Sequence, residues 1–291
     1  MPTVGARSSN DRAAIDGGAP RARPIAAGEG WSVSDLLCGA GPSDRPFEER
    51  HDGFSIAAVI EGAFTYKSDR GDAFLHAGAL LLGNHGRCFS CGHDHGVGDR
   101  CIAFSFAPEV FEEIAASAAG SSRFRFRAGS APADRAAAPI VAYAEAIARE
   151  RSPLPLEESA LRLAERVIAT ISRNNPAPVR TMGRETRRIA EALRIIEARA
   201  AEPLDLATLA ASAHMSKYHF LRVFRRVAGA TPHQALLSAR MRQAADRLLS
   251  SSDTIAAIAF DAGFGDLSTF NHRFRADFGR TPSRYRRDRG A

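Results

Sequence analysis

Two stretches in the C-terminal third of the chain decide its fold, because the second repeats the first. The first is LATLAASAHMSKYHFLRVFRRVAGATP, residues 206–232, and the second is IAAIAFDAGFGDLSTFNHRFRADFGRTP, residues 255–282. Matching residues are 49 positions apart up to the turn and 50 positions apart after it. Such a repeat predicts two copies of one small helical unit.

Each copy has the pattern of a helix-turn-helix. Ala210 and Ala259 are small residues where a second helix would cross the first one. After a tight turn, Ser216 and Asp266 stand where the second helix needs an N-cap. Phenylalanines four residues apart in this second helix are expected to face the core, namely Phe220, Phe224, Phe270 and Phe274.

The positive charge of the chain is concentrated in the same region. The sequence has 291 residues, 45% of them apolar and 25% charged, with 39 Lys and Arg against 33 Asp and Glu. Residues 181–291 hold 19 of the basic and 11 of the acidic residues, a net charge of +8, whereas residues 1–180 carry −2. A basic domain joined to a nearly neutral one points to a polyanionic partner, with nucleic acid favoured over a membrane surface. The alternative is a pair of solvated amphipathic helices with a chance surplus of arginine.

Residues 255–286 contain three motifs in succession: I-x2-I-A-x3-G-F, S-x-F-x-R-x-F and G-x-T-P-x2-Y-R. This series resembles the signature of the AraC/XylS family of transcriptional regulators. One position departs from it, because His272 stands where many members have arginine. The resemblance covers residues 185–287 and implies two helix-turn-helix subdomains joined by a long helix over residues 232–249.

The resemblance also implies which side chains contact DNA. The base-reading positions are Tyr218, Leu221 and Arg222 in the first recognition helix and Leu267, Ser268, Thr269 and His272 in the second. The rest of the expected DNA-binding set is Ser216, Lys217, His219, Arg225, Arg226, Arg273 and Arg275. Side chains near the start of such a helix reach base edges, and arginines near its end neutralise phosphates. The two leucines can at most touch a thymine methyl group, because they cannot form hydrogen bonds.

The first 172 residues have a different pattern. Residues 1–30 lack apolar periodicity and are expected to form a disordered tail. Short apolar runs at residues 55–60, 63–66, 74–76, 79–82 and 101–106 are separated by turn signals such as Glu61-Gly62, which predicts a small antiparallel sheet or barrel. Helical patterns follow at residues 109–119, 134–149 and 156–172. Pro176 and Pro178 then predict a domain boundary, because proline cannot continue a helix.

The expected fold class is therefore α+β. An N-terminal cupin-like antiparallel β-barrel with trailing helices, residues 31–172, is joined by a linker, residues 173–183, to an all-α domain with two helix-turn-helix subdomains, residues 184–287. In the AraC/XylS family, the N-terminal domain is often a cupin-like barrel that senses an effector and dimerises. The hairpin pattern of this chain agrees with that architecture.

A cluster of cysteine and histidine lies in the sheet region. The stretch CFSCGHDHGVGDRC, residues 88–101, holds three of the four cysteines of the chain. Thiolates and imidazoles at this spacing can bind zinc, and the expected ligands are Cys91, His93, His95 and Cys101, with Cys88 as a spare or redox partner. The two histidines would point the same way along a strand. The alternative is a polar turn in which the cysteines are small buried hydrophobes and the histidines are solvated.

Two further features have both a structural and a functional interpretation. His51 precedes the first predicted strand, where cupin enzymes often have a metal ligand, but the second histidine pair of such a site does not follow at the usual spacing. We therefore expect a structural histidine and no enzymatic iron or manganese site. The aromatic residues Trp31, Phe54, Phe64, Tyr66 and Phe74 are expected in the core, although an effector pocket would be made of the same residues.

The longest apolar run, residues 77–82, is far shorter than the roughly 20 residues that a membrane span requires. The N-terminus carries charges and has no apolar segment of the kind found in secretory signals. We therefore expect a cytoplasmic protein without a membrane span.

These observations predict a sequence-specific DNA-binding transcriptional regulator without catalytic activity, whose N-terminal domain senses a small effector, a metal or a redox signal. Its expected partners are double-stranded promoter or operator DNA, a second copy of the chain in a homodimer, and RNA polymerase. DNA binding would require no cofactor, and zinc is the candidate ion for the cluster. The alternative is a DNA-repair or redox thiol protein that the helix-turn-helix domain delivers to DNA, in which Arg87 and Arg100 would activate a thiol.

Overall fold

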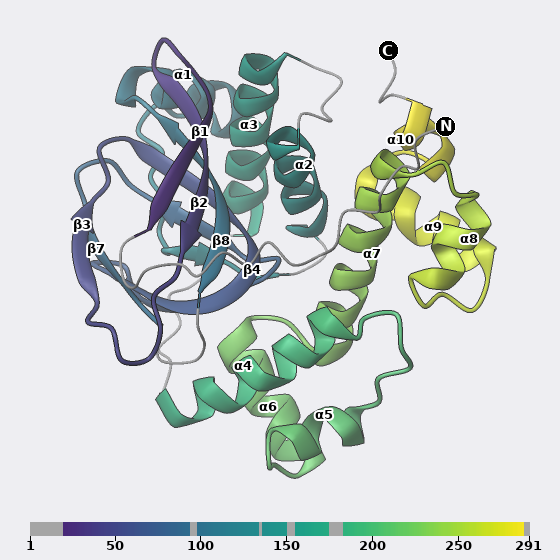
Figure 1. The fold of residues 1–291 in the computed structure, drawn as a ribbon. Helices are drawn as coiled ribbons and strands as arrows, with labels where there is room; N and C mark the ends of the chain where they lie inside the picture. Colours follow the sequence, from purple (N-terminus) through teal and green to yellow (C-terminus); the bar gives the residue numbers. More distant parts are fainter. Residues whose placement is uncertain (1–19, 94–97, 134–135, 150–154, 175–182, 288–291) are drawn as a thin grey trace, which may run out of the picture.

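The computed structural model describes residues 20–93, 98–133, 136–149, 155–174 and 183–287. Its strands are β1 (Arg21–Gly28), β2 (Trp31–Cys38), β3 (Phe47–Arg50), β4 (Phe54–Ser68), β5 (Gly71–His76), β6 (Leu80–Gly83), β7 (Cys88–Gly92), β8 (Asp99–Phe106) and β9 (Ser130–Ala131). Its helices are α1 (Pro108–Ala119), α2 (Ala138–Ala148), α3 (Leu156–Asn174), α4 (Gly183–Ala198), α5 (Leu206–Ser212), α6 (Lys217–Ala228), α7 (Pro232–Ser250), α8 (Ile255–Asp261), α9 (Leu267–Phe278) and α10 (Pro282–Arg287). The predicted α+β class, with an antiparallel sheet domain followed by helices, is confirmed (Figure 1). None of the helices in these ranges combines the length and the apolar character that crossing a membrane requires.

The long strand β4 belongs to two antiparallel sheets. Its first half pairs with β8 and β6, and its second half pairs with β5 and β7. The prediction of a turn at Glu61-Gly62 is wrong, because the chain bends there without reversing. The register of β4 and β8 shifts between Val59 and Glu61, and Gly62 has a φ of 80°. A side chain at Gly62 would collide with the carbonyl oxygen of Gly98, so only glycine fits this bend.

The N-terminal edge of the sheet lies in residues that we expected to be disordered. The prediction of a tail through residue 30 is wrong for β1, which pairs along its length with β2. Pro24 stands at a register shift in this edge strand, where its missing N–H does not interrupt a central ladder. Residues 1–19 of the predicted tail lie outside the described residues.

Three helices cover one face of the first sheet, at the positions that the sequence predicts for them. The apolar face of α2, Ile140, Val141, Ala144 and Ile147, is buried against this sheet together with residues of α1 and α3. Alternate residues of the strands enter the same core, among them Val33 of β2 and Phe104 of β8. The other face of these two strands is therefore available to line a different space.

The C-terminal helices form two similar units on either end of α7 (Figure 1). The predicted N-caps are confirmed, since Ser216 accepts a hydrogen bond from the His219 N–H and Asp266 accepts one from the Thr269 N–H. The four predicted core phenylalanines, Phe220, Phe224, Phe270 and Phe274, are fully buried. The two turns are also equivalent, because His214 and Gly263 both have positive φ at matching positions of the repeat.

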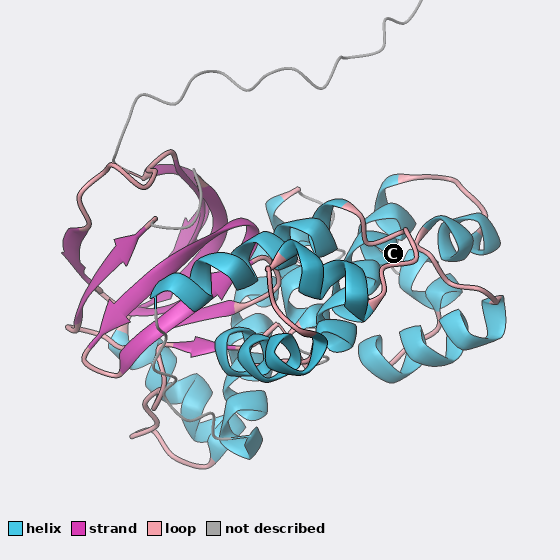
Figure 2. Cartoon of the chain, turned by 90° about the horizontal axis from the view of Figure 1, so that it is seen from below, coloured by secondary structure: helices cyan, strands magenta, loops and turns pink. Residues whose placement is uncertain are grey.

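Both units pack against the N-terminal domain, and Figure 2 shows the sheet on one side and the helices gathered beside it. Phe74 of β5 is part of the apolar core of the unit α5–α6. Ala142 of α2 is part of the apolar core around α8 and α9. An ion pair between Arg149 and Asp246 of α7, at 2.5 Å, adds to this interface.

Candidate nucleic-acid interface and sheet cavity

The surface of the recognition helices α6 and α9 carries most of the side chains that the sequence assigns to DNA. Tyr218 is 79% exposed, and Leu221 and Leu267 are 38% and 36% exposed. The exposed members of the predicted set also include Ser216, Lys217, Arg222, Arg225, Arg226, Ser268, Thr269, His272 and Arg275. His219 and Arg273 are half-buried. The structure therefore leaves most of the predicted DNA-binding side chains accessible on one helix of each unit.

The arginines of this set differ in what they contact within the protein. Arg226 forms an ion pair with Glu185 of α4, and Arg273 forms one with Asp277 of α9 at 3.1 Å. The side chains of Arg222, Arg225 and Arg275 form no ion pair with any described acidic residue. Arg222 Nη2 lies 3.4 Å from His219 Nδ1, a long contact within the same helix. All three guanidinium groups can neutralise a phosphate or contact a base without first breaking an ion pair.

Arg240 of α7 fixes the two units relative to each other, a role that the sequence pattern did not reveal. Its guanidinium donates to the carbonyl oxygens of Ala200 at 2.6 Å and Glu202 at 2.9 Å, both before α5. It also donates to the carbonyl oxygen of Gly263, at 2.8 Å, in the turn between α8 and α9. One side chain therefore bridges the loop of the first unit and the turn of the second, which limits the rotation of one recognition helix against the other.

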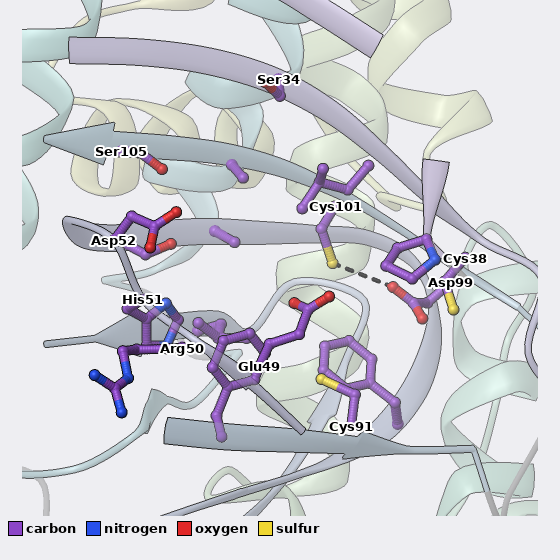
Figure 3. A pocket seen from close by; sticks show the side chains of 18 of the residues that line it. Ser34, Cys38, Glu49, Arg50, His51, Asp52, Cys91, Asp99, Cys101 and Ser105 are labelled. Carbon is purple, nitrogen blue, oxygen red and sulfur yellow. Dashed lines mark hydrogen bonds between the residues drawn. The ribbon is translucent and has the colours of Figure 1, made fainter. Parts of the chain in front are cut away.

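A cavity of about 420 Å³ lies on the face of β2 and β8 that is turned away from the helices. We call it the sheet cavity, and it is lined by Ser32, Ser34, Leu36 and Cys38 of β2, by Cys101, Ala103 and Ser105 of β8, and by residues of β3, β4 and β7. Figure 3 shows Cys38, Cys91, Asp99 and Cys101 gathered at one end, with Arg50, His51 and Asp52 at the other. The cavity is large enough for a small organic molecule and has polar groups at both ends.

Three metal-binding side chains converge at the first end of the sheet cavity. The donor atoms of Cys38, His93 and Asp99 all lie within 4.8 Å of one another, and we call these residues the donor cluster. The Asp99 carboxylate accepts hydrogen bonds from His93 Nε2 at 2.6 Å and from Cys101 Sγ at 3.4 Å. Burial lowers the pKa of His93, but the hydrogen bonds to Asp99 and Cys38 outweigh this effect and raise it to about 9. The imidazole is therefore protonated and paired with the carboxylate at neutral pH.

The predicted metal ligands are only partly brought together. His93 belongs to the donor cluster, Cys101 contacts it through Asp99, and Cys91 lines the same cavity. Burial, together with the nearby charges of Asp99, Glu49 and Cys38, raises the pKa of the Cys91 thiol. His95 lies outside the described residues, so the predicted pair of histidines along a strand stays a prediction.

Sequence reasoning missed Cys38 and Asp99, which come from different strands. Cys38 ends β2 directly opposite Asp99 at the start of β8, although about 60 residues separate them in the chain. No local spacing signals that pairing, since it depends on which strands are neighbours in the sheet. Cys88, the predicted spare thiol, is exposed on β7 and does not line the sheet cavity.

His51 has a structural environment, in agreement with the simpler of its two interpretations. Its Nε2 atom is 2.8 Å from the Tyr66 hydroxyl oxygen, and its ring stacks on Phe89 with 4.2 Å between centroids. Burial lowers the pKa of His51 to about 4, so the ring is neutral. The aromatic residues expected in the core, Trp31, Phe54, Phe64, Tyr66 and Phe74, are all buried, and Phe64 also lines the sheet cavity.

Two buried neutral histidines predict a loss of stability in acid. Burial lowers the pKa of both His51 and His76 to about 4, from an ordinary value of 6.5. In the unfolded chain these two histidines are protonated below about pH 6.5, whereas in the folded chain they stay neutral down to about pH 4. The free energy of unfolding therefore falls as the pH is lowered from 6.5 to 4. Urea unfolding at a series of pH values measures it.

The control for this prediction is an exposed histidine of the same chain. Replacing His76 with asparagine, which keeps a donor for the Ala77 carbonyl oxygen, should reduce the acid sensitivity, whereas His233→Asn should leave it unchanged. Stability that stays constant between pH 6.5 and pH 5 in the unmodified protein would contradict the prediction.

Comparison with known proteins gives a match for each of the two domains. Residues 40–165 match the AraC-like ligand binding domain, and residues 209–288 match a helix-turn-helix domain. The chain is 35% identical over 85 residues to the regulatory protein SoxS of Salmonella typhimurium, a match covering 29% of this chain and 79% of SoxS. It is 37% identical over 79 residues to the RCS-specific HTH-type transcriptional activator RclR of Escherichia coli, covering 27% of this chain and 28% of RclR. The solved DNA-binding domain of AdpA, in complex with a target DNA, is 33% identical and matches 34% of this chain and 89% of that chain, with a TM-score of 0.33.

The two matched domains define a DNA-binding transcriptional regulator that carries a ligand-binding domain. More particularly, the chain belongs to the AraC family of transcriptional regulators. The matches to RclR and to the MmsAB operon regulatory protein of Pseudomonas aeruginosa span just over a quarter of those proteins, 28% and 27%. Regulators of this family are not enzymes, so the comparisons give no support to the alternative of a thiol enzyme delivered to DNA.

Proposed function

We propose that this AraC-type regulator reads a specific operator with α6 and α9 and responds to an effector bound in the sheet cavity. The observation that carries the proposal is the repeated unit, which presents an exposed polar helix face twice in one chain and ties the two copies together through Arg240. Two such helices, one in the unit at each end of α7, suit two successive major-groove segments on one face of a duplex. In this proposal residues 31–172 form the sensor domain and residues 184–287 form the DNA-binding domain, and residues 173–183 are the linker between the two domains.

The proposed division of labour among the contacts follows from side-chain chemistry. Arg222 and His272 have donors that can reach base edges, and Ser268 and Thr269 at the start of α9 can donate to bases or phosphates. Arg225 and Arg275 are exposed farther along the helices and are assigned to phosphates. His272 replaces an arginine common in the family, so the second helix would carry less positive charge at this position.

Dimerisation and a contact with RNA polymerase are carried over from the family resemblance. Of the helices that follow Pro108, α1 and α3 are the proposed dimer interface, because α2 is buried between the sheet and the unit around α8 and α9. In this proposal one chain reads two groove segments, so a dimer would read four. The dimer would therefore lengthen the operator, and a single chain would still bind one half of it. Sedimentation equilibrium should give a mass twice that of the 31.2 kDa chain.

The salt dependence of DNA affinity tests the proposed function. Each phosphate that the protein neutralises releases counterions and adds about 0.9 to the slope of log affinity against log salt concentration. Fluorescence anisotropy with a labelled random-sequence duplex should therefore show affinity falling steeply as salt rises. An affinity that does not change with salt would contradict the proposal, because arginines would then not be neutralising the backbone.

A further inference from the structure

The donor cluster has the chemistry of a metal site. Cys38 and His93 are 6% and 4% exposed, and the Asp99 side chain is 8% exposed. They come from the end of β2, the residue after β7 and the start of β8, so three separate segments deliver one donor each. A sulfur, a nitrogen and an oxygen donor form a set that zinc and similar borderline divalent ions accept.

The spacing of the donors suits one ion after a small adjustment. Ligand atoms bound to a tetrahedral zinc at its usual bond lengths stand about 3.3 to 3.8 Å apart. The three donor atoms are within 4.8 Å of one another, and the 2.6 Å contact between His93 and Asp99 has to open by about 0.7 Å to admit an ion. The cavity beside them leaves a fourth coordination position facing bound solvent or a small ligand, and Cys101 stands 3.4 Å from Asp99 as a further donor.

The geometry points to a site for one thiophilic divalent ion, with zinc as the prototype, held by Cys38, His93 and Asp99 and serving as the signal input of this regulator. The inference deepens the sensor role proposed above and rests on it only for the signalling step. Of the four ligands expected from the sequence it keeps one, His93, and it adds Cys38 and Asp99.

Asp99 lies next to the part of β4 that contacts the C-terminal domain. Asp99 is paired across the sheet with Gly62 of β4, and the next residue, Ala63, packs in the apolar core of the unit α5–α6. The bend at Gly62 leaves no space between it and Asp99. A shift of the Asp99 backbone on metal binding would therefore press on β4 at the place where Ala63 packs against the unit α5–α6.

Metal retention by the full-length protein tests the site itself. Reduced protein is stripped with a chelator, equilibrated with zinc, passed through a desalting column and assayed by plasma mass spectrometry. The wild-type chain and Cys88→Ser, whose exposed thiol lies outside the cavity, should each retain about one zinc. Cys38→Ser should lose it, and equal retention by Cys38→Ser and wild type would overturn the assignment.

A spectroscopic measurement on the wild type avoids any doubt about folding of the variant. Cobalt(II) in place of zinc should give thiolate-to-metal charge-transfer absorption and the intense visible bands of tetrahedral coordination, and zinc should abolish both. Weak bands of octahedral cobalt without charge transfer would show that no thiolate is bound and would overturn the site.

The signalling step is tested on a duplex obtained by binding-site selection. Adding zinc to stripped wild-type protein should change the affinity for that duplex by at least about 5-fold, the lower end of typical coupling between sites, and Cys38→Ser should not respond. Zinc retention with unchanged DNA affinity would overturn the signalling role. Loss of all DNA binding would instead contradict the proposed function, so the two failures are distinguishable.

Discussion

Replacing Phe274 with alanine is expected to lower the free energy of unfolding by about 3 to 5 kcal/mol, the usual cost of truncating a fully buried phenylalanine. The ring of Phe274 stacks on Phe278 with 4.3 Å between centroids and contacts Phe270 and Tyr285 at 5.6 and 5.3 Å. Alanine leaves a cavity at the centre of this aromatic group, and the surrounding helices can collapse into it only partly. Denaturant unfolding followed by circular dichroism measures the loss.

A second phenylalanine of the same unit is the matched control. Phe260 of α8 is 55% exposed, so Phe260→Ala should change the free energy of unfolding by no more than about 0.5 kcal/mol. The Phe274 variant should also lose the part of its DNA affinity that depends on α9. If both variants destabilise the protein equally, the second unit does not have the core described above.

Replacing Arg222 with alanine is expected to weaken binding to the selected operator by about 1 to 3 kcal/mol, or roughly 5- to 150-fold, and to relax the base preference at one position. Arg222 is exposed on α6, near the side where Tyr218 projects, and no described acidic residue pairs with it. Its guanidinium can therefore form two hydrogen bonds with the edge of a guanine. Competition with duplexes that differ at single positions measures the change in preference.

Arg225 provides the contrast on the same helix. If it contacts a phosphate, Arg225→Ala should weaken binding to all sequences by a similar factor and lower the salt slope by about 0.9. Arg222→Ala should change the ranking of sequences. The assignment of base and phosphate contacts would be contradicted if the two variants gave the same pattern of losses across the duplex series.

The sequence was sufficient to predict the C-terminal domain in detail, because its signals are local. The spacing of Phe220 and Phe224 follows from helical periodicity, and the caps Ser216 and Asp266 directly precede the helices they cap. Because the two units repeat the same pattern, the cap and core positions predicted in one unit supported those predicted in the other. Arg240 was missed because its three hydrogen bonds go to backbone carbonyl groups of both units, and a carbonyl group leaves no mark in the sequence.

The N-terminal site was predicted less completely, because strand order is not a local property. The stretch from Cys88 to Cys101 contains His93 and Asp99 of the donor cluster, but the cluster also needs Cys38 from a strand far away in the chain. The bend of β4 at Gly62 resembles a turn in sequence and becomes a bulge only because β8 continues alongside it. The edge strand β1 has no apolar alternation in its sequence, because its first four residues are exposed and bury no apolar side chains.

Selection of binding sites from a random DNA library tests the central claim most directly. Full-length protein is incubated with random duplexes, and bound molecules are amplified and sequenced. The account predicts an enriched motif of two boxes whose centres lie about 10 base pairs apart, one helical turn, so that both face the same side of the DNA. Two variants are expected to change the motif. Arg222→Ala should weaken the base preference within one box, and a substitution of His272 should change the base preference within the other. An enrichment of one box only, or of no sequence at all, would contradict the claim that both recognition helices read DNA.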